Sequence, residues 1–333
     1  LLLFFVACGE KDKSATKQNS DKKVIKVSMK FVDDEQTAKS FKKVVDKINE
    51  RSKGSLELQL FTSGTLPIGK DSMEQVANGS DWISVDGVNF LGDYVPDYNA
   101  VTGPLLYQSF DEYLRMVKTP LVQELNKLAE DKGIKVLSLD WVFGFRSMMT
   151  NKVIKTPDDM KGLNIRVPTS QLYTYTIKAL GGNPVAMPYP DTYAAIQQGV
   201  IDGAENNELA LTSNKHGEVA KYYSYDMHQM VPDILIGNLK FLNSLSPEER
   251  EIFNQGFVLI SQVQRDAWTM SVEKAKNQAQ KDMNVKFIYP DVALFKEKVL
   301  PLHGEVLNAN PKLKPIYDKI QEIGKNMQKE DNK

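Results

Sequence analysis

A single helical pattern over about 247–283 constrains the fold of this chain more than any other feature of its sequence. The pattern begins at a capping box, 246-SPEE-249, in which a serine cap is followed by proline at the first helical position and by glutamate at the third. At 1.5 Å per residue such a helix is roughly 55 Å long, which exceeds the diameter of one small domain. We therefore expect it to run along two lobes of a larger structure.

The remainder of the 333-residue chain alternates between strand and helix patterns. Strands are predicted at 24–27, 56–60, 82–86, 134–141, 163–167 and 200–207, and helices at 37–53, 71–78, 121–132, from 156, at 169–180, 191–199 and near 316–327. Such alternation predicts an α/β fold with a parallel or mixed sheet. A second unit is expected to start near residue 146.

The predicted strand 163-LNIRVP-168 contains an arginine between two apolar residues. Because the apolar positions 163, 165 and 167 alternate, Asn164 and Arg166 share the other face. Both faces of a parallel strand in an α/β domain are covered, and an unpaired buried charge costs on the order of several kcal/mol. Arg166 therefore requires a carboxylate, supplied either by the protein or by a ligand.

Composition and charge argue against two classes of partner. The chain is 41% apolar and 26% charged, as ordinary globular proteins are. Its net charge of −1 offers no basic surface for nucleic acid or an anionic membrane. No apolar run approaches the roughly 18–20 residues that span a bilayer.

The first residues predict an export signal. The apolar run 1-LLLFFVA-7 stops at Cys8, the only cysteine in the chain, and 5-FVACG-9 resembles the lipobox at which bacterial lipoprotein precursors are cleaved and acylated. The polar run that follows, up to residue 23, predicts a flexible tether. The alternative is a degenerate signal peptide with an incidental cysteine. Both interpretations place the mature protein outside the cytoplasmic membrane, without disulfides.

Motif spacing provides no positive case for catalysis, a metal or a cofactor. The three histidines, at 216, 228 and 303, are far apart, and 64-GTLPIG-69 lacks the Lys-Ser/Thr pair of a phosphate loop. The S-x-x-K match at 40–43 lies inside an amphipathic helix without its companion motifs. Asp202 and Glu205 remain as an acid–base candidate, although two carboxylates in a D-G-x-E turn are more often structural.

Three segments resemble the DctP-like solute-binding proteins of tripartite ATP-independent periplasmic (TRAP) transporters. They are 158-DDMKGLNIRVP-168, 181-GGNPVAMPYPDTYAAIQQGVIDGAENN-207 and 222-YYSYDMH-228. The resemblance implies a type II-like periplasmic binding protein: two α/β lobes, joined by crossing strands and a long helix, that close on a ligand in the cleft between them. Lobe I would comprise 24–143 with 232–271, and lobe II 144–231 with 272–333, after a signal remnant and tether at 1–23.

The resemblance also implies the ligand contacts of lobe II. The family arginine of I-R-V-P pairs bidentately with the ligand carboxylate, and Arg166 occupies that position. Arg146 matches a second arginine that contacts ligand, and Asn206 a cleft asparagine that holds the carboxylate or a neighbouring hydroxyl. Tyr189 stands where the family packs an aromatic ring on the ligand, with lobe packing as the alternative.

Four further residues are implied at the cleft. His228 matches a cleft-edge histidine that serves either ligand contact or hinge packing. Asp86 matches a lobe I position that accepts hydrogen bonds from ligand hydroxyls. Lys70 and Asp71 are weaker candidates from the same lobe.

Two departures from the family pattern bear on the ligand. Ala204 and Asn207 replace the glutamine and proline of the common D-G-Q-E-N-P form. This form resembles the branch that binds sugar acids, such as hexuronates, aldonates and keto-gulonates. Sialic acid and C4-dicarboxylate binders, which usually carry the glutamine, are the alternative within the family.

The predicted function is that of an extracytoplasmic receptor, a monomer held at the membrane only by a lipid at Cys8, that delivers a sugar acid to a sodium-driven TRAP permease. Two other classes stay open. One is a ligand-sensing subunit that acts on a membrane kinase. The other is an enzyme on the same scaffold, for example a lyase, for which Asp202 and Glu205 would have to act.

The lipobox predicts that Cys8 becomes the lipidated N-terminus of the mature protein. Replacing the acylated sulfur in Cys8→Ser should release the protein from membranes or leave the precursor uncleaved, as measured by membrane fractionation and mass spectrometry. A native N-terminus well beyond residue 8 would contradict this assignment.

Overall fold

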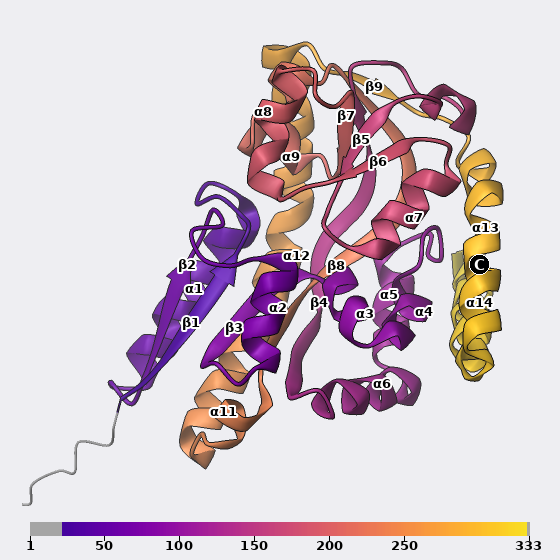
Figure 1. Cartoon of the computed structure of the whole chain (residues 1–333). Coiled ribbons are helices and arrows are strands. Elements are labelled where there is room, and N and C mark those ends of the chain that lie inside the picture. Colours follow the sequence, from indigo (N-terminus) through magenta and orange to yellow (C-terminus); the bar gives the residue numbers. More distant parts are fainter. Residues whose placement is uncertain (1–21, 332–333) are drawn as a thin grey trace, which may run out of the picture.

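The computed structural model describes residues 22–331, except for the side chains of 258–262 and 331. The predicted signal remnant, the lipobox at Cys8 and most of the tether lie outside these residues. Within them, one mixed sheet runs through the whole molecule in the order β2-β1-β3-β8-β4-β7-β5-β6, with β9 paired to β8 (Figure 1). Its strands are β1 Lys23–Met29, β2 Leu56–Phe61, β3 Trp82–Gly87, β4 Ile134–Thr150, β5 Asn164–Val167, β6 Asn183–Ala186, β7 Gly203–Asn206, β8 Tyr222–Asn238 and β9 Lys286–Ile288.

Two antiparallel strands of 17 residues each, β4 and β8, are shared by both halves of the sheet. The last residues of β8 lie between β3 and the start of β4, whereas the end of β4 pairs with β7. Register shifts interrupt the β4–β8 ladder at four places between Val136 and Met148, and such bulges bend and twist a strand pair. The strand predicted at 134–141 therefore continues into the second lobe.

Helices cover the two halves of the sheet separately. Around β1–β3 and the adjoining parts of β4 and β8 lie α1 Gln36–Arg51, α2 Gly69–Ala77, α3 Val88–Tyr94, α4 Asn99–Thr102, α5 Phe110–Val117, α6 Pro120–Glu130 and α11 Leu239–Asn243. Around β5–β7 lie α7 Gln171–Ala179, α8 Thr192–Gln197, α9 Leu209–Ser213 and α10 His216–Val219. This two-lobed α/β arrangement confirms the predicted fold class, and Figure 1 shows the lobes one above the other.

The long helix is confirmed as α12, Pro247–Met283, with the capping box of Ser246 and Glu249 formed in both directions. It contacts α1 of lobe I, strand β4, and α9 and α10 of lobe II. Figure 1 shows it, in orange, passing from one lobe to the other. Its length therefore fixes the spacing of the two lobes along one side.

The C-terminal helices correct the predicted lobe boundaries. Helix α13 (Val292–Ala309) contacts both α7 and α4, and α14 (Lys314–Asp331) packs against α5 and α4 of lobe I. An ion pair of 2.9 Å between Arg115 and Glu330 holds the end of α14 against α5. Assigning all of 272–333 to lobe II was therefore wrong for α14, because its apolar face is buried on lobe I.

Some predictions from the sequence were wrong in segments whose conformation depends on tertiary contacts. Pro157–Met160 forms a single 3₁₀ turn rather than a helix, and the strand predicted at 200–207 is reduced to Gly203–Asn206. The sequence did not predict strand β8 or helix α13. Strand β8 is buried on both faces over most of its length, so apolar and polar residues alternate little along it.

Gly144 lies in the part of β4 that crosses between the lobes. Its φ is +82°, and a Cβ there would meet Cζ2 of Trp268 on α12 at 2.9 Å. Both the left-handed backbone and the close indole therefore require glycine.

We predict that Gly144→Ala lowers the free energy of unfolding by about 2–4 kcal/mol, because it combines backbone strain with overpacking. Gly162→Ala is the matched control: φ is +75° there, but nothing lies within 4 Å of the added Cβ, so about 1–2 kcal/mol of strain alone is expected. Urea denaturation of both variants checks the difference, and equal losses would contradict a role for the Trp268 contact.

Candidate functional site

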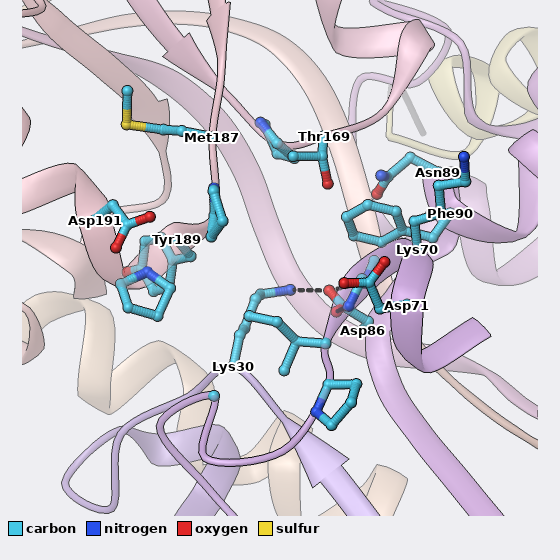
Figure 2. A pocket seen from close by; sticks show the side chains of 18 of the residues that line it. Lys30, Lys70, Asp71, Asp86, Asn89, Phe90, Thr169, Met187, Tyr189 and Asp191 are labelled. Carbon is cyan, nitrogen blue, oxygen red and sulfur yellow. Dashed lines mark hydrogen bonds and ion pairs between the residues drawn. The ribbon is translucent and has the colours of Figure 1, made fainter. Parts of the chain in front are cut away.

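A cavity of about 710 Å³ lies between the two halves of the sheet. Its wall includes seven of the residues predicted to bind ligand: Arg166, Arg146, Asn206, Tyr189, Asp86, Lys70 and Asp71. Figure 2 shows Tyr189, Met187 and Asp191 of lobe II facing Lys30, Asp86 and Phe90 of lobe I across this space. A volume of this size accommodates a small metabolite.

Arg166 is buried at the end of β5 without a carboxylate partner. Its side chain is 3% exposed, and Nε and one terminal nitrogen donate to the carbonyl of Met187 at 3.1 and 2.8 Å. No carboxylate of the described residues lies within 4.0 Å of its guanidinium, whereas the ring of Tyr189 lies 5.5 Å away. Burial lowers the pKa of Arg166 to about 10, so a cation is held here at a cost. Arg166 is therefore a buried cation on the cavity wall without a carboxylate partner among the described residues.

Arg146, by contrast, is neutralised by the protein. Its guanidinium pairs with both carboxylate oxygens of Glu205, one through Nε and the other at 2.7 Å, and also donates to the Glu205 carbonyl. Burial opposes ionisation of Glu205, but Arg146 and His228 bring its pKa below the usual value. Arg146 therefore lines the cavity with its charge already compensated.

His228, predicted to serve either ligand contact or hinge packing, is not among the residues that line the cavity. The ring is fully buried, with Nδ1 at 2.8 Å from Asp226 and Nε2 at 3.4 Å from Glu205. Burial alone would lower the pKa of His228, but the two carboxylates raise it to about 9. These contacts link β8 to Glu205 of β7 and fit the packing alternative, and a ligand contact of His228 stays a prediction.

Asp202 and Glu205 do not form an acid–base pair. Asp202 accepts a hydrogen bond from the backbone of Asn164 at 2.8 Å, and Glu205 is engaged by Arg146 in the interior. The two carboxylates alternate across the start of β7 and serve different contacts. The structural interpretation of this turn therefore holds.

The lobe I wall is centred on Lys30, which sequence reasoning missed. Its Nζ lies 2.8 Å from Asp86 and 3.4 Å from Asp233, and 4.6 and 5.3 Å from the ring centres of Phe31 and Phe143. Lys30 continues the alternation of 24-VIKVSMK-30 directly after β1. Its position at the end of a strand was the sequence feature that could have identified it as a site residue. Asp233 gave no such signal, because only the pairing of β8 with β3 brings it there.

The remaining predicted residues lie around the rim and floor. Lys70 and Asp71 are exposed in the first turn of α2, where Figure 2 shows them beside Phe90. Asn206 is buried, and its Oδ1 accepts from the backbone of Asn207 at 2.8 Å. Whether these side chains touch a ligand stays a prediction.

A hydrogen-bonded chain crosses between the lobes beside the cavity. Asn214 of lobe II donates to the hydroxyl of Tyr189 at 2.8 Å and to Glu35 of lobe I at 3.3 Å. Glu35 is 2% exposed, and burial raises its pKa to about 7. One ionisable group therefore sits at the contact between the two lobes.

Comparison with known proteins identifies the family of this chain. Residues 27–310 match the model of the bacterial extracellular solute-binding proteins, family 7, the DctP family. The chain belongs to this family. Its members are the extracytoplasmic receptors of TRAP transporters and deliver their solutes to the membrane permease.

Three solved TRAP periplasmic solute-binding proteins share this fold. One from Fusobacterium nucleatum, with bound sn-glycerol 3-phosphate, is 58% identical with a TM-score of 0.87, over 93% of this chain and 100% of that one. One from Desulfovibrio salexigens, in complex with diglycerolphosphate, is 33% identical with a TM-score of 0.88, over 93% and 99%. One from Anaerococcus prevotii, with bound D-glucuronate, is 35% identical with a TM-score of 0.86, over 92% and 99%.

The residues described by the structure include no group of three or more histidine, cysteine, aspartate or glutamate side chains arranged for a metal. No helix among them is long and apolar enough to cross a membrane.

The buried Glu35 predicts a pH dependence of stability. Because its pKa is raised from 4.5 to about 7 in the folded protein, folding takes up a proton between these values, and Glu35 destabilises the fold increasingly as pH rises through this window. Glu35→Gln should therefore raise the melting temperature at pH 8 relative to the native protein, with the gain shrinking toward pH 5. Glu50→Gln, at an exposed position of α1, is the control, and an equal gain in both variants would contradict this origin.

Proposed function

We propose that this receptor binds a small anion that carries several hydroxyl groups, and that Arg166 holds its anionic group. The observation that carries the proposal is the buried guanidinium of Arg166 on the cavity wall, without a carboxylate partner among the described residues. A ligand carboxylate or phosphate would supply the missing charge and accept the N–H groups that Met187 leaves free.

A sugar acid is the ligand class we favour. Lys30 is paired with Asp86 and Asp233, and Arg146 with Glu205, so Arg166 is left as the one buried cation of the described cavity wall without a carboxylate within 4.0 Å. One unpaired guanidinium matches one ligand carboxylate. The D-G-A-E-N-N sequence and the D-glucuronate complex of the Anaerococcus prevotii protein support the same class.

A polyol phosphate is the second candidate, favoured by one specific observation. The Fusobacterium nucleatum protein, at 58% identity, carries bound sn-glycerol 3-phosphate. A phosphate ester brings up to two negative charges, so this ligand would need a second cation. Lys70, exposed in the first turn of α2 on the cavity rim, would supply it.

We also propose how the protein acts in the cell. It acts by binding without turnover, since Asp202 and Glu205 are separated by their structural contacts. It is held at the membrane by a lipid on Cys8, and it functions as a monomer. The sequence 5-FVACG-9 supports the anchor.

Removal of the Arg166 charge should abolish tight binding. Truncating one partner of a buried charge pair costs about 2–5 kcal/mol, so Arg166→Ala should weaken the better of D-glucuronate and sn-glycerol 3-phosphate by roughly 30-fold to several thousand-fold. Arg166→Lys should recover only part of this, because an ammonium lacks two parallel donors. Isothermal titration calorimetry measures all three proteins.

The control is Arg51→Ala, which removes the same charge from the exposed end of α1 and should leave affinity unchanged. Arg166→Ala should fold, because the guanidinium has no protein carboxylate to leave unpaired. Unchanged affinity in Arg166→Ala would overturn the proposal.

A further inference from the structure

Two buried polar atoms on the cavity wall have no hydrogen-bond partner. They are Oδ2 of Asp233, an acceptor, and Nδ2 of Asn89, a donor, on side chains that are 1% and 2% exposed. An unpaired buried polar group costs about 1–3 kcal/mol, so such atoms are expected to have a partner in the working protein. Both belong to lobe I, opposite Arg166.

Asp86, the residue predicted to read ligand hydroxyls, is less available than Asp233. Its Oδ1 accepts from Lys30 and from the backbone of Gly87, both at 2.8 Å, and its Oδ2 accepts from the backbone of Gly69 at 2.7 Å. Three of roughly four acceptor positions are therefore used to fix β3 and the start of α2. Asp233 uses only Oδ1, toward Lys30 at 3.4 Å.

Lys30 completes the arrangement. An ammonium has three N–H donors, and the two carboxylates take two of them. The rings of Phe31 and Phe143 lie 4.6 and 5.3 Å from Nζ, and the third N–H remains on the same ammonium, which lies 3.4 Å from the carboxylate of Asp233. A donor and an acceptor thus stand side by side at the cavity.

We propose that Lys30 and Asp233 form a subsite that selects a ligand hydroxyl: Lys30 donates to the hydroxyl oxygen, and the hydroxyl proton is donated to Oδ2 of Asp233. This proposal rests on the proposed function, since it assigns how the same cavity recognises the polyol part of the anion. A hydroxyl both donates and accepts, which neither a methylene nor a second carboxylate does. An analogue without this hydroxyl is rejected because it leaves both groups unpaired.

Asp233→Asn tests the subsite. Lys30 keeps the amide oxygen toward Nζ, so the amide nitrogen replaces Oδ2 and an acceptor becomes a donor. The probe is D-glucuronate with its monodeoxy derivatives, or sn-glycerol 3-phosphate with its deoxy analogue propane-1,2-diol 1-phosphate, whichever series binds the native protein. In the native protein, one deoxy derivative should bind about 10- to 100-fold more weakly than its parent, and Asp233→Asn should remove most of this difference.

Asp86→Asn is the matched control on the neighbouring carboxylate. It should lower the melting temperature and weaken parent and deoxy probes by the same factor. If Asp233→Asn also weakens all probes equally, Asp233 serves only as a counter-ion and the proposal is wrong, while the proposed function stands. Failure of every probe to bind the native protein would instead overturn the proposed function.

If Asp233→Asn does not fold, the pH dependence of ligand discrimination tests the subsite in a protein that keeps Asp233. Burial raises the pKa of Asp233 to about 6, so the carboxylate takes up a proton as pH falls from 8 to 5, and an Oδ2 that carries this proton becomes a donor. The charged groups around it are Lys30 after β1, Asp86 on β3, Arg146 on β4 and Glu35 before α1. Because Glu35 titrates in the same range, the measurement uses Glu35→Gln. Discrimination between D-glucuronate and its deoxy derivative should fall about tenfold toward pH 5; discrimination independent of pH would contradict the subsite.

Discussion

Compensation of buried charge is the constraint on which this site depends. Strands β4, β7 and β8 meet where Arg146, Glu205, His228 and Asp226 lie, and these groups balance one another as two cations and two anions at neutral pH. Asp226 also accepts from the backbone of Met148 at 3.0 Å, so the network joins side chains to the strand ladder. Removing one member would leave an unpaired buried charge, at a cost of about 3–5 kcal/mol.

Arg166 stands next to this balanced network without belonging to it. Its position on β5 is fixed by parallel pairing with β6 and β7, and its side chain is held by the carbonyl of Met187. The protein thereby keeps a cation oriented and desolvated before any ligand arrives, which reduces the ordering cost of binding. Under the proposed function, the ligand is the missing counter-ion of the lobe II wall.

The lobe I wall differs in chemistry. There Lys30 is shared between two carboxylates that come from β3 and β8, and one of them retains a free acceptor. Under the two proposals, the lobe II wall neutralises the charge of the ligand and the lobe I wall pairs its hydroxyl groups. A ligand must satisfy both, and this gives more discrimination than charge alone.

Much of the local structure was predictable because it depends on short-range patterns. The capping box at Ser246 set the start of α12, and most of the predicted helices and strands lie within a few residues of their observed bounds. The position of Arg166 in an otherwise apolar strand was enough to predict that it lacks solvent and needs an anion. The full length of β8 was not predictable, since a strand buried on both faces alternates little.

The sequence by itself determined the α/β class, the long helix and the family, and it predicts a central role for Arg166, because each of these depends on residues adjacent along the chain. Only the tertiary structure decided which charges are free. Arg146 and Arg166 are the same residue type in the sequence, but the pairing of β7 with β4 brings Glu205 into ion-pair contact with Arg146 and not with Arg166. Likewise, the register of β8 against β3 brings Asp233, more than 200 residues away in sequence, to Lys30. Electrostatic partnership acts through distances of a few ångströms, and those distances exist only after folding.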